Sequence, residues 1–434
     1  MNSKFRLLIN IFLNSNFAKS AFKLSLKSLI AQLIPLLFYP ILTRIYTPED
    51  FGISATILSL VPILIILSTG GYENAILISD TKEESFSVIK YVLIRSVVIL
   101  TFMEILLLFF SSYLSDKLGD LDYEKLLFLV PLISFFSIIT IVYNEFMIYQ
   151  NSFNQLGNFK IINSALVFLP KLFVNNFNFL QNGLLYGELI GRGAFALLSL
   201  RKFNKLKIYL FCKFSISEFK KISNKFIEFQ KYSMPEQLIS NFGGAAPLFV
   251  LSIYFSATDI GYFSIASSVL TAPITIFTLS IRDVFRQKAN EEYKLNGTCS
   301  KTYLLILKFV FFFGLIGFLL IGLIFPTIVD IIFGDSWISI SKFSLIQLPM
   351  FFLSFVSMSL SGVFVIANKV RLSLFWQLYY TSVTIAGLLI GIFIFNEFEY
   401  ALYSLVIARC SAYLLYTYMS YNVAKGNINF TGTI

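Results

Sequence analysis

The 434-residue sequence is 57% hydrophobic and only 13% charged, whereas a soluble domain carries roughly a quarter charged residues. It has no histidine and three widely spaced cysteines, Cys212, Cys299 and Cys410, which excludes histidine-based acid–base chemistry and predicts neither a zinc site nor a disulfide framework. The formal net charge of +10 would suit a nucleic-acid binder, but the basic residues lie between apolar runs, so we expect no nucleic-acid partner.

Twelve apolar stretches are candidates for membrane spans, each of which needs about 20 residues to cross the bilayer as a helix. The first six are Ser20–Leu42, Phe51–Thr69, Val88–Phe110, Lys125–Tyr149, Ile161–Val174 and Leu180–Leu200. The second six are Met234–Phe255, Gly261–Ile281, Thr302–Phe325, Lys342–Ala367, Leu372–Phe395 and Tyr400–Val423. The pattern predicts an all-α polytopic membrane protein, in which the short fifth span is the least typical.

The charges between the spans predict the topology. If the N-terminus is cytoplasmic, the cytoplasmic segments hold 22 Lys and Arg, and the opposite side holds only Arg44 and Lys117 beside ten acidic residues. Because positive charge is retained on the cytoplasmic side, we expect both termini to be cytoplasmic.

The most basic hydrophilic segment lies near the middle of the chain. Residues 201–233 contain nine basic and two acidic residues, which indicates a cytoplasmic linker that lies against anionic lipid headgroups. We therefore predict an N-terminal lobe (1–200), a basic linker (201–233) and a C-terminal lobe (234–434).

Two similar turns suggest an internal repeat. Thr47-Pro48-Glu49-Asp50-Phe51-Gly52 and Ser256-Ala257-Thr258-Asp259-Ile260-Gly261 are 209 residues apart. Both carry the hydroxyl-x-x-acid pattern that caps the start of a helix. Since each half has an even number of spans, the halves are expected to be parallel six-helix lobes around a central cavity, an arrangement typical of transporters.

Charges within the spans are the candidate substrate-binding groups, because a charge at the centre of a span costs roughly 2.5–3.5 kcal/mol on insertion scales and usually faces a cavity or a partner. The candidates are Lys23, Lys27, Arg95, Glu188, Arg192, Lys308 and Arg409. The four in the first, third and ninth spans have an alternative interpretation, in which long side chains snorkel to the cytoplasmic surface.

Glu188 and Arg192 have the i,i+4 spacing of an ion pair on one helix face. Beside them Gly183, Gly187 and Gly191 form a surface that another helix can approach closely. A structural lock and a substrate site both remain open for this pair.

The sequence lacks a nucleotide-binding P-loop, a nucleophile elbow and a metalloprotease motif. We therefore expect no catalytic residues, no metal and no cofactor. Alternating access around cationic groups would move an anionic substrate without covalent chemistry.

Five segments resemble the Wzx-type oligosaccharide flippases of the polysaccharide biosynthesis branch of the MOP exporter superfamily. They are Ile41–Gly52, Gly71–Ile76, Asp259–Ser264, Val284–Ala289 and Phe333–Trp337. Each motif is loose, but their order, the twelve spans and the basic central segment together support the resemblance.

The resemblance implies a flippase that moves an undecaprenyl-diphosphate-linked oligosaccharide repeat from the cytoplasmic to the outer leaflet of the bacterial inner membrane. Its product would enter lipopolysaccharide O-antigen, capsule or another surface polymer. The partners implied are the lipid-linked oligosaccharide, membrane lipids, a polymerase and a chain-length regulator. No universal motif of this family assigns site residues here.

Three alternatives stay open. A multidrug exporter of the same superfamily would suit an acid-rich cavity, and a peptidoglycan-precursor exporter would carry motifs absent here. A membrane polysaccharide polymerase would have a large outer loop, whereas the longest predicted outer loop is residues 326–341.

Overall fold

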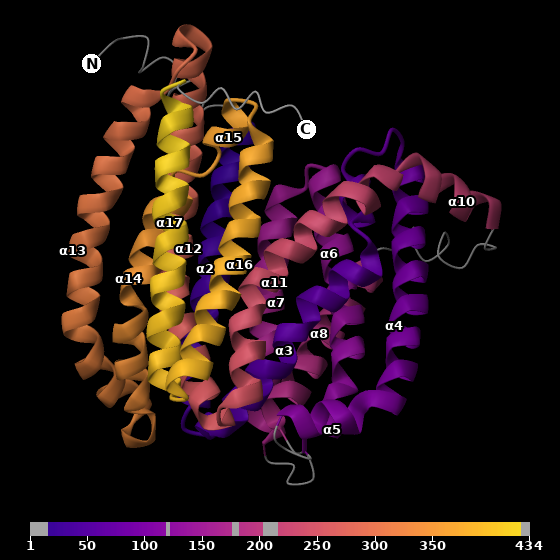
Figure 1. The fold of residues 1–434 in the computed structure, drawn as a ribbon. Helices are drawn as coiled ribbons and strands as arrows, with labels where there is room; N and C mark the ends of the chain where they lie inside the picture. The colour runs from indigo at the N-terminus through magenta and orange to yellow at the C-terminus, as the bar shows by residue number, and fades with distance from the viewer. Residues whose placement is uncertain (1–15, 119–121, 176–181, 203–215, 427–434) are drawn as a thin grey trace. The chain divides into compact units, whose positions relative to one another are not determined.

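The computed structural model describes residues 16–118, 122–175, 182–202 and 216–426, all of which are helical or lie in turns between helices (Figure 1). The first half contains α2 (Asn16–Leu42), α3 (Pro48–Thr69), η1 (Tyr72–Ile76), α4 (Lys82–Leu118), α5 (Asp122–Leu127), α6 (Leu129–Tyr149), α7 (Phe153–Val174) and α8 (Gly183–Lys202). The remainder contains α10 (Ile216–Lys225), η2 (Phe229–Ser233), α11 (Met234–Tyr254), α12 (Ala257–Asn296), α13 (Ser300–Phe333), η3 (Asp335–Trp337), α14 (Ser339–Ser359), α15 (Val363–Ile366), α16 (Val370–Phe395) and α17 (Phe398–Ala424).

Each predicted span falls on helical structure, although the fourth covers both α5 and α6, and residues 180 and 181 of the sixth lie outside the described residues. Within the described residues, nine helices are long and apolar enough to cross a membrane. The spans predicted on α7, α11 and α17 are not among the nine, and α7 and α17 carry charges such as Lys171 and Arg409. The prediction of an all-α polytopic membrane protein is confirmed.

Several helices extend beyond the apolar stretches that predicted them. α12 continues to Asn296, well past the predicted end at Ile281. It ends where Gly297 takes a left-handed conformation with φ of 67° and donates its N–H to the Tyr293 carbonyl, as is common at helix C-termini. The tenth predicted span is instead divided into α14 and α15, where Gly362 has φ of 112°.

The chain forms two compact units. The first comprises the residues up to Tyr46 together with Ile57–Leu238, and the second comprises Thr47–Thr56 together with Ile239–Ile434. The first turns of α3 therefore belong to the second unit, although the rest of α3 belongs to the first. The predicted boundaries at 201 and 233 stay a prediction.

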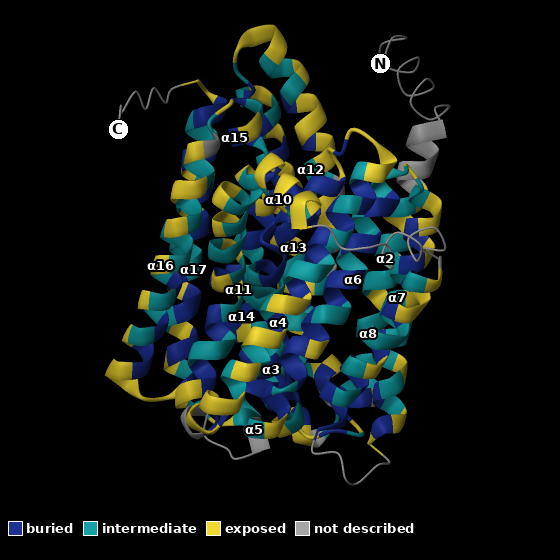
Figure 2. Ribbon diagram, turned by 90° about the vertical axis from the view of Figure 1, so that its right-hand side faces the viewer, coloured by how far each residue is buried: buried dark blue, intermediate teal, exposed yellow. Residues whose placement is uncertain are grey.

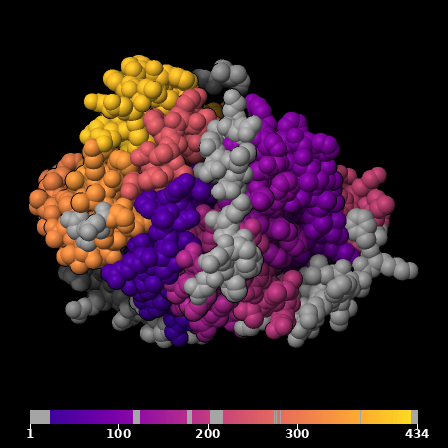
Figure 3. All heavy atoms as spheres, turned by 90° about the horizontal axis from the view of Figure 1, so that it is seen from below, coloured from indigo at the N-terminus to yellow at the C-terminus, as the bar shows by residue number. Residues whose placement is uncertain are grey.

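In the first unit, α7 packs against both α2 and α8, and α6 packs against α4 and α8. The purple residues in Figure 3, which belong to α4 through α6, form one continuous group of atoms. The core includes Tyr72 of η1, which is fully buried and donates its hydroxyl proton to Gln230 Oε1 at 3.1 Å. This contact joins η1 to η2, close to the helix α10.

In the second unit, both predicted capping turns are present. The Thr47 hydroxyl caps the Asp50 N–H and the Asp50 carboxylate accepts from the Thr47 N–H at 2.9 Å. Ser256 caps the Asp259 N–H at 3.2 Å in the same way. The sequence pattern therefore predicted the starts of α3 and α12 correctly.

The two repeated glycines of these turns contact each other's helix start. A Cβ atom added to Gly52 would lie 1.7 Å from the Ala257 carbonyl oxygen, and one added to Gly261 would lie 1.8 Å from the Pro48 carbonyl oxygen. Ala257 and Pro48 occupy equivalent positions of the repeat, so the contact is reciprocal. Only glycine allows backbones this close.

Candidate functional site

The first unit contains a buried cluster of three charged side chains. Glu188 Oε2 accepts from Lys171 Nζ at 2.5 Å, and Glu188 Oε1 accepts from Arg192 Nε at 2.5 Å. Lys171 is 7% exposed and Glu188 is 3% exposed. Since one carboxylate lies between two cations, the cluster carries one uncompensated positive charge.

The glycines of α8 allow this cluster to form. A Cβ atom on Gly187 would lie 2.9 Å from Lys171 N, and one on Gly191 would lie 2.3 Å from the Leu166 carbonyl oxygen. The four-residue glycine spacing therefore brings α8 against α7, as predicted. Tyr46 fixes the same region by donating its hydroxyl proton to the Lys171 carbonyl oxygen at 2.7 Å.

Arg192 is the accessible member of the cluster. Its side chain is 32% exposed, compared with 9% for Lys171 and 4% for Glu188. One Nη1 N–H is donated to Ser137 Oγ at 2.7 Å. A guanidinium has five N–H donors, and in the described part of the chain Arg192 uses two of them on Glu188 and Ser137. The others can donate to a ligand.

A second cationic group lies between α2 and α7. Lys27 Nζ donates to Asn154 Oδ1 at 2.6 Å and to Asn158 Oδ1 at 2.5 Å, and Lys160 Nζ donates to Ser28 Oγ at 3.2 Å. Lys23, one turn before Lys27 on α2, is exposed. The two amides orient the Lys27 ammonium group and the hydroxyl orients that of Lys160, and neither contact neutralises the charge.

No ion pair of Lys23, Lys27 or Lys160 occurs among the residues that the structure describes. A cation in a membrane span without an acidic partner is costly. An anionic ligand would lower this cost, so the α2/α7 seam is a candidate anion site.

Arg95 has a different environment in the same unit. Its Nη1 donates to the Leu67 carbonyl oxygen at 3.0 Å and to the Ser68 carbonyl oxygen, and its guanidinium lies 5.9 Å from the Tyr72 ring centroid. It donates to carbonyl groups that the C-terminal end of α3 leaves without a helical partner, and the negative end of that helix dipole stabilises its positive charge. The contact gives Arg95 a structural role at the end of α3.

The two candidates in the second unit have different environments. Arg409 Nη2 donates to the Gly243 carbonyl oxygen at 3.3 Å, and its guanidinium lies 5.5 Å from the Tyr380 ring centroid. Its Nε is buried and makes no hydrogen bond with any described residue. Lys308 is exposed on α13 next to Phe309, which is 55% exposed.

The structure thus brings only some of the seven predicted substrate-binding residues into contact. It brings Glu188 and Arg192 together and places Lys23 and Lys27 on one helix, whereas Arg95 and Arg409 each bond backbone carbonyls within their own unit. Sequence reasoning missed Lys171 as the partner of Glu188 and left Lys160 outside the fifth span. The glycine spacing indicated a close helix, but it could not identify which lysine on that helix meets Glu188.

Within the described ranges, no three His, Cys, Asp or Glu side chains are grouped so that they could hold a metal ion. The cations of the cluster and of the α2/α7 seam offer electrostatic and hydrogen-bonding recognition. An anion is the ligand that these cations favour.

Comparisons with known proteins relate the fold to membrane transporters. The chain is similar to the inward-facing structure of a multidrug resistance MATE family transporter of the MOP superfamily, with a TM-score of 0.72, 17% identity, and coverage of 93% of this chain and 96% of that one. It is also similar to the lipid II flippase MurJ in an inward closed conformation, with a TM-score of 0.71, 14% identity, and coverage of 95% and 90%.

A third similar structure is a MOP superfamily transporter from Pyrococcus furiosus, described as having a binding pocket of reverse polarity, with a TM-score of 0.62, 16% identity, and coverage of 96% and 98%. At these identities the similarities show a shared fold. No curated protein matches the sequence. A family model described as polysaccharide biosynthesis protein matches residues 41–342. The chain belongs to the polysaccharide biosynthesis protein family.

Proposed function

We propose that this protein is a flippase that translocates undecaprenyl-diphosphate-linked oligosaccharide repeats from the cytoplasmic to the outer leaflet of the bacterial inner membrane. The family supports a role in surface polysaccharide assembly, and the fold supports transport. The proposed membrane is the bacterial inner membrane, with both termini in the cytoplasm. The product would be O-antigen, capsule or a related polymer.

The observation that carries the proposal is the excess of intramembrane cations in the first unit. Glu188 is already neutralised by Lys171 and Arg192, and the α2/α7 seam adds three ammonium groups. A diphosphate carries negative charge and many acceptor oxygens, so it complements both features. A cationic drug would be repelled, which disfavours the multidrug-exporter alternative.

Arg192 would act by direct recognition. Glu188 and Ser137 hold its guanidinium in place, so little side-chain freedom is lost when its remaining N–H groups bind phosphate oxygens. Lys27, held by Asn154 and Asn158, would supply a second positive charge. Neither residue forms or breaks a covalent bond in this mechanism.

Alternating access would then expose the bound head group to each side in turn. The other proposed partners are a polymerase, a chain-length regulator and membrane lipids. A polymerase activity of the chain itself is disfavoured, because the described residues place their candidate groups within helices and not on a large outer loop.

The test uses cells that make the lipid-linked repeat but lack this protein. A membrane-impermeant sugar-modifying reagent then reports the leaflet on which the repeat accumulates. We expect accumulation of unpolymerised repeat on the cytoplasmic side. Accumulation of unpolymerised repeat on the outer side would reject the flippase and favour a polymerase.

A further inference from the structure

An apolar cavity of about 240 Å³ lies within the first unit, between α3, α4, α5 and α6. α4 contributes five positions, which are Met103, Leu106, Leu107, Phe110 and Leu114. Their spacing follows one face of the helix. Leu60 and Leu64 of α3 line the opposite side, and every lining residue is apolar.

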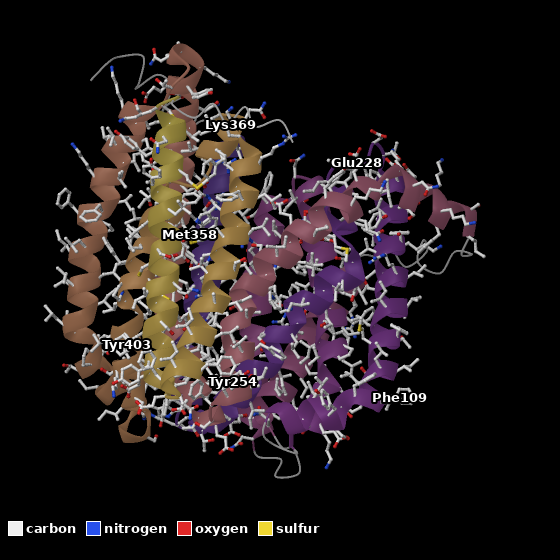
Figure 4. The ribbon with its side chains drawn as sticks, in the orientation of Figure 1. Phe109, Glu228, Tyr254, Met358, Lys369 and Tyr403 are labelled. Atoms are coloured by element: carbon white, nitrogen blue, oxygen red, sulfur yellow. The ribbon has the colours of Figure 1, made fainter. Side chains whose placement is uncertain are left out.

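The outer face of α4 is apolar and exposed. Leu108 is 67% exposed and Phe109 is 77% exposed, and Figure 4 shows Phe109 on the outer side of α4. Figure 2 shows exposed residues along the same helix. Because α4 is long and apolar enough to cross a membrane, we expect this face to contact lipid. Phe110 lines the cavity and is also 55% exposed, so a hydrocarbon chain can reach the cavity from the bilayer beside it.

The size and lining of the cavity select an apolar occupant. An apolar cavity of about 150 Å³ stays dry and takes up benzene, and this cavity is larger. Water would find no polar partner in its lining. A segment of hydrocarbon chain fits both the volume and the chemistry.

A fixed cation lies on the same two helices. Arg95 of α4 bonds the carbonyls of Leu67 and Ser68 on α3, while Leu64, three residues before Leu67, lines the cavity. Along α4, Arg95 precedes Met103 by eight residues, or about 12 Å of helix. An anionic head near Arg95 and an apolar chain in the cavity would therefore follow the same helix pair.

We propose that this cavity holds part of the isoprenyl chain of the lipid carrier in a binding state in which the anionic head group lies near Arg95, before it reaches the diphosphate site proposed at Arg192 and Lys27. The inference rests on the proposed function and extends it, since it assigns a site to the lipid chain as well as to the head group. Charge at Arg95 favours a polyprenyl phosphate over a zwitterionic phospholipid.

The experiment measures binding of undecaprenyl phosphate to the purified full chain by native mass spectrometry. Leu107→Trp fills the cavity, and Leu108→Trp adds the same bulk to the exposed face of α4. We expect Leu107→Trp to weaken binding by about tenfold or more, while Leu108→Trp binds as the unmodified protein does. Leu107→Phe replaces Leu107→Trp if the larger side chain prevents folding, with the melting temperature as the check.

Equal binding by the Leu107 and Leu108 variants would overturn the proposal. Displacement of undecaprenyl phosphate by an equal concentration of phosphatidylglycerol would also overturn it, because the cavity would then hold ordinary phospholipid chains. The assay does not depend on translocation. Failure of the flippase proposal would instead appear in the leaflet assay, as normal display on the outer side in cells without the protein.

Discussion

The two units are stabilised by different interactions. In the first, ionised and amide side chains link α2, α7 and α8 through Glu188 and Lys27. In the second, the Gly52 and Gly261 backbones contact closely, and the rings of Trp376 and Tyr380 pack at a tilt against Tyr413, at ring-centroid distances of 6.3 and 5.7 Å. The first unit therefore combines structural support with the proposed anion site, whereas in the second Arg409 is not paired with an acid among the described residues.

The largest expected effect comes from removing the central acid of the first unit. Glu188→Ala leaves Lys171 buried without its carboxylate, and breaking a buried pair costs about 3–5 kcal/mol. We expect a marked fall in folded yield and in thermal stability measured in detergent. Glu399→Gln, which breaks the exposed pair with Lys342, is the control and should leave the melting temperature almost unchanged, because solvent screens exposed ion pairs. Similar losses in both variants would contradict a structural role for the buried cluster.

In the second unit, the next largest effect is expected from disturbing the close backbone contact between the starts of α3 and α12. Gly52→Ala places a Cβ atom 1.7 Å from the Ala257 carbonyl oxygen, so α3 or α12 must shift, at a cost of about 1–3 kcal/mol. Gly317→Ala on α13 meets no atom within 4 Å and serves as the control. Thermal unfolding of the two purified variants should differ clearly; equal stability would argue against the reciprocal helix contact.

Substitution of Arg192 in the first unit and of Arg409 in the second tests whether each arginine contributes to translocation. Arg192→Ala leaves Glu188 paired with Lys171, and Arg409→Ala removes only a carbonyl bond and a ring contact, so both variants should remain folded. We expect translocation of the lipid-linked repeat to fall by about tenfold in each, equivalent to ~1.4 kcal/mol. Expression level and melting temperature are the controls. Unchanged translocation in both single variants and in the double variant would remove these arginines from the substrate path.

The smallest expected effect concerns the helix α10 of the first unit. Lys225 forms ion pairs with Asp80, at 2.8 Å, and with Glu84. Hydrogen bonding to Lys225 lowers the pKa of Asp80 below its usual value of 3.8, so the pair is intact above that value and is lost as the pH falls through the lowered pKa. Hydrogen exchange of α10 should increase slightly below about pH 4, and Lys225→Ala should show that increase at neutral pH. No difference between the two proteins at neutral pH would mean that these pairs do not hold α10.

Much of the helical framework could be predicted, because local features determine it. Apolar length predicted the spans, and the hydroxyl-x-x-acid turns at Thr47 and Ser256 predicted two helix starts that the hydrogen bonds confirm. The α12 extension was missed, since Arg282–Asn296 is helical without being apolar.

The site was less predictable because its contacts join separate helices. Glu188 and Arg192 share a helix and were paired correctly, but Lys171 lies 17 residues earlier on α7. Lys160 was missed because the fifth span was expected to begin at Ile161, whereas α7 begins at Phe153. The α3–α6 cavity depends on how four helices fill space, which the apolar pattern of each helix does not specify.

Transport of a diphosphate-linked glycolipid by the cations of the first unit is the step on which the proposed function depends. It is tested most directly in liposomes that contain the purified protein and a fluorescent undecaprenyl-diphosphate-linked oligosaccharide, with a membrane-impermeant quencher to report the leaflet. We expect rapid transbilayer exchange with the unmodified protein and about tenfold slower exchange with Arg192→Ala. The proposed transport would be contradicted if exchange were no faster than in protein-free liposomes. It would also be contradicted if a lipid without the diphosphate exchanged equally fast.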